Sequence, residues 1–174
     1  MDSALRADPQ RYLRIVNGWI QENPNNHDAY FGRHFAWMKL GEPQRALDDL
    51  NKVIELERDR MAFLSRGEVY RYLGEYQKAI DDYNRGEALD PAQWQDDAFG
   101  LLFEADTHAR LGDEASALAC CARLHHDFWT PGMNSTPSGG KADIAEKLRR
   151  IAADARKRPS TARAERGAIF ALLT

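Results

Sequence analysis

The stretch YRYLGEYQKAIDDYNRGEALDP, from Tyr70 to Pro91, recurs in altered form at two other places in the chain. These are WMKLGEPQRALDDLNKVIELE, residues 37–57, and HARLGDEASALACCARLHHD, residues 108–127. In each stretch an aromatic ring lies three residues before a Leu-Gly pair, and an alanine lies five residues after the glycine. The glycines are residues 41, 74 and 112, so the spacings are 33 and 38 residues. A period of this length predicts an array of structural repeats.

Each stretch has the apolar spacing of a helical hairpin. The glycine lies where a first helix ends and the chain turns, a place that favours a residue without a Cβ atom. After Gly41, the apolar residues Ala46, Leu47, Leu50 and Val53 follow the helical period. The small alanine lets the two helices approach closely. Because one hairpin of this size cannot bury its apolar face alone, neighbouring hairpins are expected to stack.

This pattern resembles the tetratricopeptide repeat family, whose unit is a 34-residue helix-turn-helix. The resemblance covers about residues 9–127 and implies an all-α fold, a right-handed superhelical α-solenoid of about three and a half helix-turn-helix repeats. Four features depart from the family pattern. His34 stands where a small residue is preferred, Gly86 where alanine is expected and Arg58 where a closing proline is expected, and the junction PAQWQDD before the third unit is longer. The middle unit matches best, through Gly67, Tyr70, Leu73, Gly74, Tyr76, Ala79, Tyr83 and Pro91.

The chain divides into three parts. Residues 1–127 form the predicted repeat domain, and the Pro-, Gly- and Ser-containing residues 128–140 are predicted to form a loop or linker. Residues 141–174 are predicted to form a C-terminal capping helix and tail, because an apolar stripe runs through 144–155. The helices expected before that cap are 9–22, 27–40, 43–57, 60–73, 76–89, 95–111 and 114–127.

The family resemblance implies that the first helix of each hairpin lines a concave groove in which ligands lie. Most of the expected contact residues are apolar or aromatic, which favours binding of a helix or an extended peptide segment. In the alternative interpretation these residues belong to the core, or the apolar segment 168–173 of the chain itself fills the groove. The expected partner-binding residues are Phe31, Phe35, Met38, Leu64, Glu68, Arg71, Tyr72, Phe99, Phe103, Asp106 and Arg110.

Composition excludes several classes of protein. The 24 basic and 27 acidic residues give a net charge of −3, and no motif for reading nucleic acid is present. No apolar run approaches the length of a membrane span, no signal peptide is recognisable, and two adjacent cysteines cannot build a disulfide framework. A cytoplasmic location is therefore expected. Charge is uneven, since residues 141–174 carry +5 and the rest of the chain −8.

No catalytic motif is recognisable, and we expect neither catalytic residues, nor a cofactor, nor a metal site. Cys121 and His125 lie four residues apart on one expected helix, but two ligands do not make a zinc site. The sequence thus predicts a non-catalytic protein-interaction scaffold with a protein or peptide partner. The alternatives are a dedicated inhibitor, immunity-type or chaperone protein for a single partner, and a self-assembling module that forms homo-oligomers through its C-terminal tail.

Overall fold

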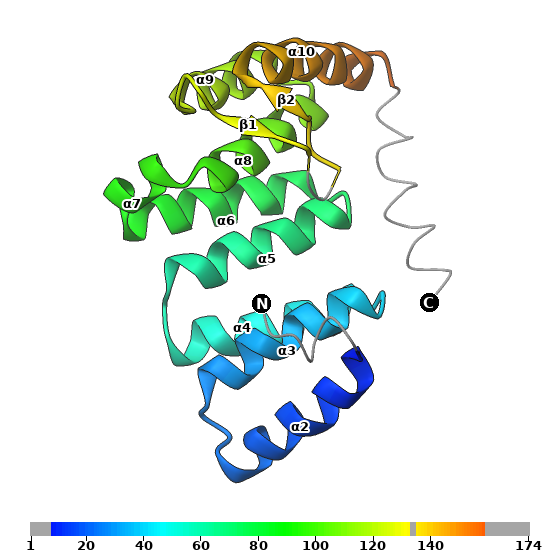
Figure 1. Cartoon of the computed structure of the whole chain (residues 1–174), viewed down its shortest axis with the longest axis vertical. Coiled ribbons are helices and arrows are strands. Elements are labelled where there is room, and N and C mark those ends of the chain that lie inside the picture. The colour runs from blue at the N-terminus through cyan, green and yellow to red at the C-terminus, as the bar shows by residue number, and fades with distance from the viewer. Residues whose placement is uncertain (1–7, 133–134, 159–174) are drawn as a thin grey trace.

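The computed structural model describes residues 8–132 and 135–158, and its helices stack in successive neighbouring pairs (Figure 1). The expected all-α helical repeat is confirmed. Each hairpin packs on the next, so the stack extends along one axis from α2 to α10 (Figure 1). The helices are α2 (Pro9–Glu22), α3 (His27–Lys39), α4 (Pro43–Leu56), α5 (Arg60–Tyr72), α6 (Tyr76–Leu89), α7 (Pro91–Asp96), α8 (Ala98–Leu111), α9 (Glu114–Arg123) and α10 (Lys141–Lys157).

Glycine ends the first helix of each repeat, as the sequence predicts. Gly41, Gly74 and Gly112 have φ angles of +74°, +78° and +86°. This left-handed conformation is strained for a residue with a Cβ atom, and it lets the chain reverse immediately after the helix. The next helix then begins within two residues, which keeps the two helices of a hairpin antiparallel and in contact.

A hydrogen-bonded ladder repeats along the stack and holds successive helices in register. Arg33 of α3 donates to both carboxylate oxygens of Asp49 on α4, at 2.9 and 2.5 Å, and to Asn17 Oδ1 on α2 at 2.7 Å. One repeat later, Arg66 donates to both oxygens of Asp82 at 2.7 Å and to Asn51 Oδ1 at 2.7 Å. Such bidentate pairs fix geometry as well as adding energy. Each arginine therefore connects three consecutive helices.

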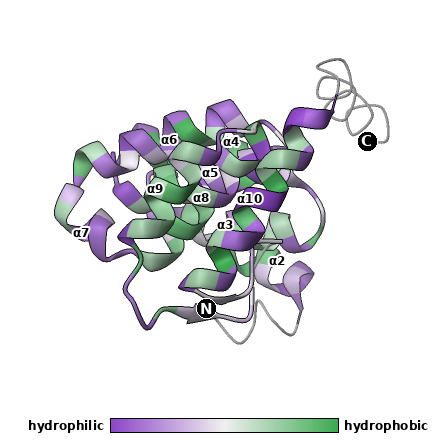
Figure 2. Ribbon diagram, turned by 90° about the horizontal axis from the view of Figure 1, so that it is seen from above, coloured by the Kyte–Doolittle hydropathy of each residue, from purple (hydrophilic) through white to green (hydrophobic). Residues whose placement is uncertain are grey.

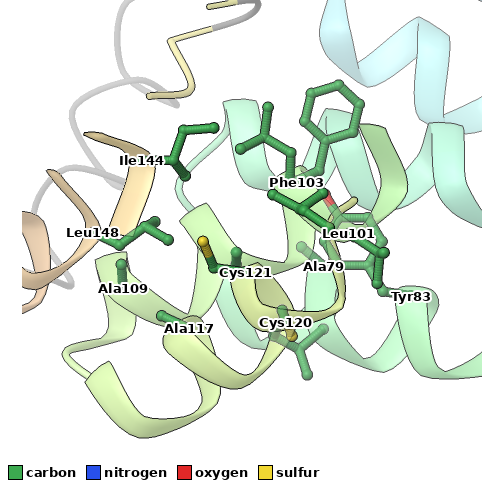
Figure 3. Close-up of a cluster of buried hydrophobic side chains, with 14 of the residues drawn as sticks. Ala79, Tyr83, Leu101, Phe103, Ala109, Ala117, Cys120, Cys121, Ile144 and Leu148 are labelled. Atoms are coloured by element: carbon green, nitrogen blue, oxygen red, sulfur yellow. The ribbon is translucent and has the colours of Figure 1, made fainter. Parts of the chain in front are cut away.

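The largest part of the core lies at the C-terminal end, between α6, α8, α9 and α10 (Figure 3). Tyr83, Leu101, Ile144 and Leu148 are almost completely buried there. Hydrophobic residues gather between the helices, and hydrophilic residues line the outer surface (Figure 2). Helix α10 thus covers the last apolar face of the stack. Among the described residues, no helix is both long enough and apolar enough to span a membrane.

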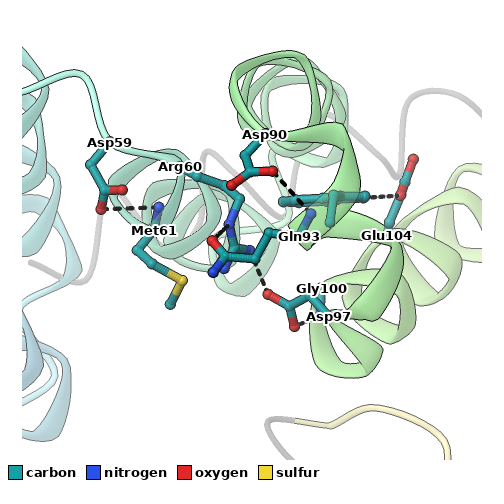
Figure 4. A network of polar contacts seen from close by, with 9 residues as sticks. Asp59, Arg60, Met61, Asp90, Gln93, Asp97, Gly100 and Glu104 are labelled. Carbon is teal, nitrogen blue, oxygen red and sulfur yellow. Dashed lines mark hydrogen bonds and ion pairs between the residues drawn. The ribbon is translucent and has the colours of Figure 1, made fainter.

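The junction before the third repeat forms a short helix of its own, whereas a single helix starting at residue 95 was expected. Pro91 begins the short helix α7, which buries Trp94 completely against Tyr83. Arg60 ties α5 to this junction by donating to Gln93 at 3.0 Å and to Asp97 at 2.6 Å (Figure 4). Asp97 also caps α8, because its carboxylate accepts from the backbone N–H of Gly100.

Trp94 explains why Gly86 replaces the expected alanine. A Cβ atom on Gly86 would lie 3.1 Å from the Trp94 ring and 3.4 Å from the carbonyl oxygen of Arg60. The missing side chain therefore makes room for the indole of α7.

Between α9 and α10 the chain folds back against the stack. Trp129–Thr130 (β1) pairs antiparallel with Gly139–Gly140 (β2), and both strands lie beside α8 (Figure 1). Arg110 of α8 donates to the carbonyl oxygen of Ser135 at 2.8 Å, and Thr136 is buried. The expected loop is therefore packed on the repeats. The segment 159–174, including residues 168–173 that the alternative interpretation places in the groove, lies outside the described residues.

Candidate partner-binding groove

A pocket of about 390 Å³ opens between the first helices of the first two repeats. We call it the α3–α5 pocket. It is lined by His34, Phe35, Met38 and Lys39 of α3, by Ser65, Glu68, Val69, Arg71 and Tyr72 of α5, and by Ser135 of the segment that folds back from α9. The helical spacing of the lining residues arises because one face of each first helix points toward the concave side of the stack.

Five of the predicted partner-binding residues meet in this pocket: Phe35, Met38, Glu68, Arg71 and Tyr72. Tyr72 is the most accessible of them, since 56% of its surface is exposed at the end of α5. Phe35 and Met38 are half-buried. The pocket therefore offers aromatic and apolar surface beside groups of both charges, Lys39 and Glu68.

His34 is the unusual residue of the pocket. It stands seven residues before Gly41, and the equivalent residues of the next two repeats are Gly67 and Ala105. Its ring is 2% exposed and lies 3.8 Å from the ring centroid of Phe35. Burial lowers the pKa of His34 to about 4, so the imidazole is neutral at pH 7. Among the described residues, Nδ1 of His34 has no hydrogen-bond partner.

Three predicted contact residues lie in the interior. Leu64 and Phe103 are 5% and 4% exposed and belong to the C-terminal core, and Asp106 is fully buried. Asp106 Oδ2 accepts from Arg71 Nη1 at 2.9 Å and from Arg110 Nε at 2.7 Å, and the Arg71 guanidinium lies 5.2 Å from the centroid of the Phe103 ring. The prediction that these three side chains stand open in a groove was wrong, because Leu64 and Phe103 pack into the core and Asp106 is held by Arg71 and Arg110.

The remaining predicted residues lie outside the pocket. Phe31 is half-buried against the core between α3, α4 and α5. Phe99 is 43% exposed and contacts the ring of Phe128 edge-on at 6.2 Å. Arg110 joins Asp106 to Ser135. Five lining residues were not among the expected partner-binding residues: His34, Lys39, Ser65, Val69 and Ser135. Position on a repeat could have indicated Val69, whereas Ser135 comes from a segment outside the repeat pattern.

Two groups of described side chains place three possible metal ligands near one another: Glu104, His108 and Cys120, and the exposed His125, His126 and Asp127. Neither group contains both Cys121 and His125, the two possible ligands that lie four residues apart in the sequence. Cys121 is buried, with its Sγ atom 3.7 Å from the carbonyl oxygen of Lys141, whereas His125 lies beyond the end of α9 and pairs with Asp127.

Comparison with known proteins supports the repeat. The tetratricopeptide repeat family matches residues 61–93, which span α5, α6 and the start of α7, so the resemblance expected from the sequence is confirmed there. No curated protein matches the chain. A crystal structure of MamA is 16% identical, with a TM-score of 0.65 over 98% of this chain and 91% of that chain. MamA residues 41 to the end, from Desulfovibrio magneticus RS-1, is 17% identical, with a TM-score of 0.65 over 97% and 86%. These likenesses establish a shared fold.

Proposed function

We propose that this chain is a non-catalytic protein-interaction scaffold that holds a peptide or helical segment of its partner at the α3–α5 pocket. The observation that carries the proposal is the pocket itself, which opens between the first helices of two stacked repeats. A tetratricopeptide repeat at residues 61–93 and the helical-repeat fold support a role in binding proteins.

The size of the pocket favours an anchor side chain as its occupant. A volume of about 390 Å³ lies near the lower end of the range of about 300–1,000 Å³ for small-ligand sites. Phe35, Met38 and Tyr72 supply the apolar contact, and aromatic anchors of this kind dominate the energy of many interfaces. We expect an apolar side chain of the partner to enter here while its backbone runs over the concave face.

Polar groups around the pocket would orient the partner. Lys39 and Glu68 lie on opposite helices of the pocket and can distinguish the two directions of a bound peptide. The net charge of −8 on residues 1–140 favours a basic partner segment, chiefly by raising the rate of encounter.

Selection of peptides from a random library, with the full chain as bait, tests the proposal. Replacing Tyr72 by alanine should weaken a selected peptide about tenfold or more, because an exposed aromatic anchor is lost. The matched control is Trp19→Ala on α2, which removes an aromatic side chain that is 46% exposed and does not line the pocket. Equal binding by the Tyr72→Ala variant and the wild type would place the contact elsewhere.

Two further measurements, capture of natural partners with their stoichiometry and the oligomeric state of the chain, separate the alternatives. A single natural partner bound tightly at equal stoichiometry would identify a dedicated inhibitor, immunity-type protein or chaperone that uses this surface. Self-association that is lost on removing residues 159–174 would identify an assembly module. A cytoplasmic location stays a prediction.

A further inference from the structure

The third repeat breaks the ladder that the first two repeats share. The ladder arginines, Arg33 and Arg66, stand eight residues before the glycine of their repeat, and the ladder aspartates stand eight residues after it. In the third repeat, the equivalent positions hold Glu104 and Cys120. A cation and an anion are thus replaced by a carboxyl and a thiol, which cannot form the same ion pair.

A third donor joins these two side chains. His108 lies one helical turn after Glu104 on α8, and Cys120 faces both from α9. The three ligand atoms, a carboxylate oxygen, an imidazole nitrogen and Sγ, all lie within 4.8 Å of one another. Glu104 and Cys120 are each 6% exposed, and the side chain of His108 is 17% exposed. The group is therefore a preformed and largely dry cluster that solvent reaches along the His108 ring.

The surroundings of the cluster orient two of its members. Nδ1 of His108 lies 3.5 Å from Oδ2 of Asp113, which favours the tautomer whose Nε2 lone pair is available to a metal. The indole N–H of Trp94 lies 3.4 Å from Oε2 of Glu104, and this hydrogen bond holds the carboxylate in place (Figure 4). A histidine that binds zinc commonly donates its other ring N–H to a carboxylate, which fixes the orientation of the ring.

We propose that Glu104, His108 and Cys120 bind one zinc ion, which fastens α8 to α9. Sulfur, nitrogen and oxygen donors together suit Zn²⁺, whereas Ca²⁺ and Mg²⁺ prefer oxygen ligands alone. Zinc bonds of about 2.0–2.3 Å put neighbouring ligand atoms about 3.3–3.6 Å apart, so the three side chains draw together slightly around the ion. Three protein ligands leave the fourth position to water. Binding replaces the thiol proton by the metal.

Zinc and cobalt titrations of the full chain, with its cysteines kept reduced, test the site. We expect one Zn²⁺ per chain, in competition with a chromophoric chelator, and Co²⁺ in the same site should show an intense near-ultraviolet sulfur-to-cobalt charge-transfer band. Cys120→Ser should abolish the band and weaken zinc binding at least 100-fold. The matched control is Cys121→Ser, which removes the neighbouring buried thiol and should keep both signals.

Two further variants complete the test. Asp113→Asn keeps a residue able to cap α9, yet removes the charge beside His108, so zinc should bind about tenfold more weakly. His125→Asn with His126→Asn removes the exposed alternative cluster and should leave binding unchanged. The proposal is overturned if the wild type binds no zinc, if the cobalt band survives in Cys120→Ser, or if the His125/His126 variant loses binding. Circular dichroism of each variant verifies that the helices persist.

Discussion

Lowering the pH is expected to destabilise the folded chain through His34. This side chain of α3 is buried at the wall of the α3–α5 pocket, and burial lowers its pKa to about 4, from an ordinary value of 6.5. In the unfolded chain the imidazole takes up a proton as the pH falls through 6.5, whereas in the folded chain it stays neutral until about pH 4. Between these values the unfolded state binds more protons, so the free energy of unfolding decreases as the pH falls.

The size of the effect follows from the two pKa values. One pKa unit corresponds to about 1.4 kcal/mol, so the full difference amounts to roughly 3 kcal/mol below pH 4. Between pH 7 and pH 5 the expected loss is about 2 kcal/mol, because at pH 5 the unfolded imidazole is almost fully protonated and the folded one is almost fully neutral. A chain of this size would lose about 4–8 °C in its unfolding midpoint.

Urea unfolding at pH 7 and pH 5, for the wild type and for His34→Gln, isolates the contribution. Other carboxyls and histidines titrate in both proteins and cancel in the difference between them. The wild type should lose about 2 kcal/mol more than His34→Gln on going to pH 5. Losses that agree within about 0.5 kcal/mol would refute the reasoning, because they would mean that His34 is protonated as easily in the folded chain as in the unfolded one.

Two further substitutions test the packing of the repeats. Gly67→Ala should lower the free energy of unfolding by about 2 kcal/mol, because the added Cβ atom would lie 2.4 Å from the Tyr83 ring. The control is Gly18→Ala, which has open space around it and should stabilise α2 by up to about 1 kcal/mol. Arg66→Ala should cost about 3 kcal/mol, since it leaves the buried Asp82 with only the more exposed Arg85, whose Nη1 lies 3.2 Å from Oδ1. Replacing Arg66 by Met and Asp82 by Leu should recover most of that loss, and failure to recover it would mean that the pair is net stabilising.

The helices were predictable because their ends carry local signals. Gly41, Gly74 and Gly112 end three helices, Pro24 and its neighbours separate α2 from α3, and the apolar period identifies what lies between. Helix α7 was missed because PAQWQDD contains a proline, two aspartates and only one large apolar residue, Trp94. Its stability comes from burying Trp94, a tertiary contact that no local pattern announces.

The candidate groove was predictable only where the repeats determine it. Phe35, Met38 and Tyr72, which position within a repeat assigned to the groove, line one pocket, and their contact with a partner stays a prediction. The same rule failed for Phe103, whose side chain packs into the C-terminal core, against which Phe128 of the segment after α9 also packs. A composition rich in Pro, Gly and Ser predicts irregular backbone, but it contains no information on what that backbone contacts.

The repeats supply an internal standard that a single sequence otherwise lacks. Each hairpin packs against its neighbours in the same way, so a residue that makes the contacts between them recurs at the same position, as Arg33 and Arg66 do. A residue that does not recur has a role that is specific to its own repeat. His34 replaces a small residue at the wall of the pocket, and Glu104 with Cys120 replaces an ion pair beside His108. Both departures bury polar groups at places where apolar or paired groups would give a more stable fold. A ligand bound at these places can offset the unfavourable free energy of burying them.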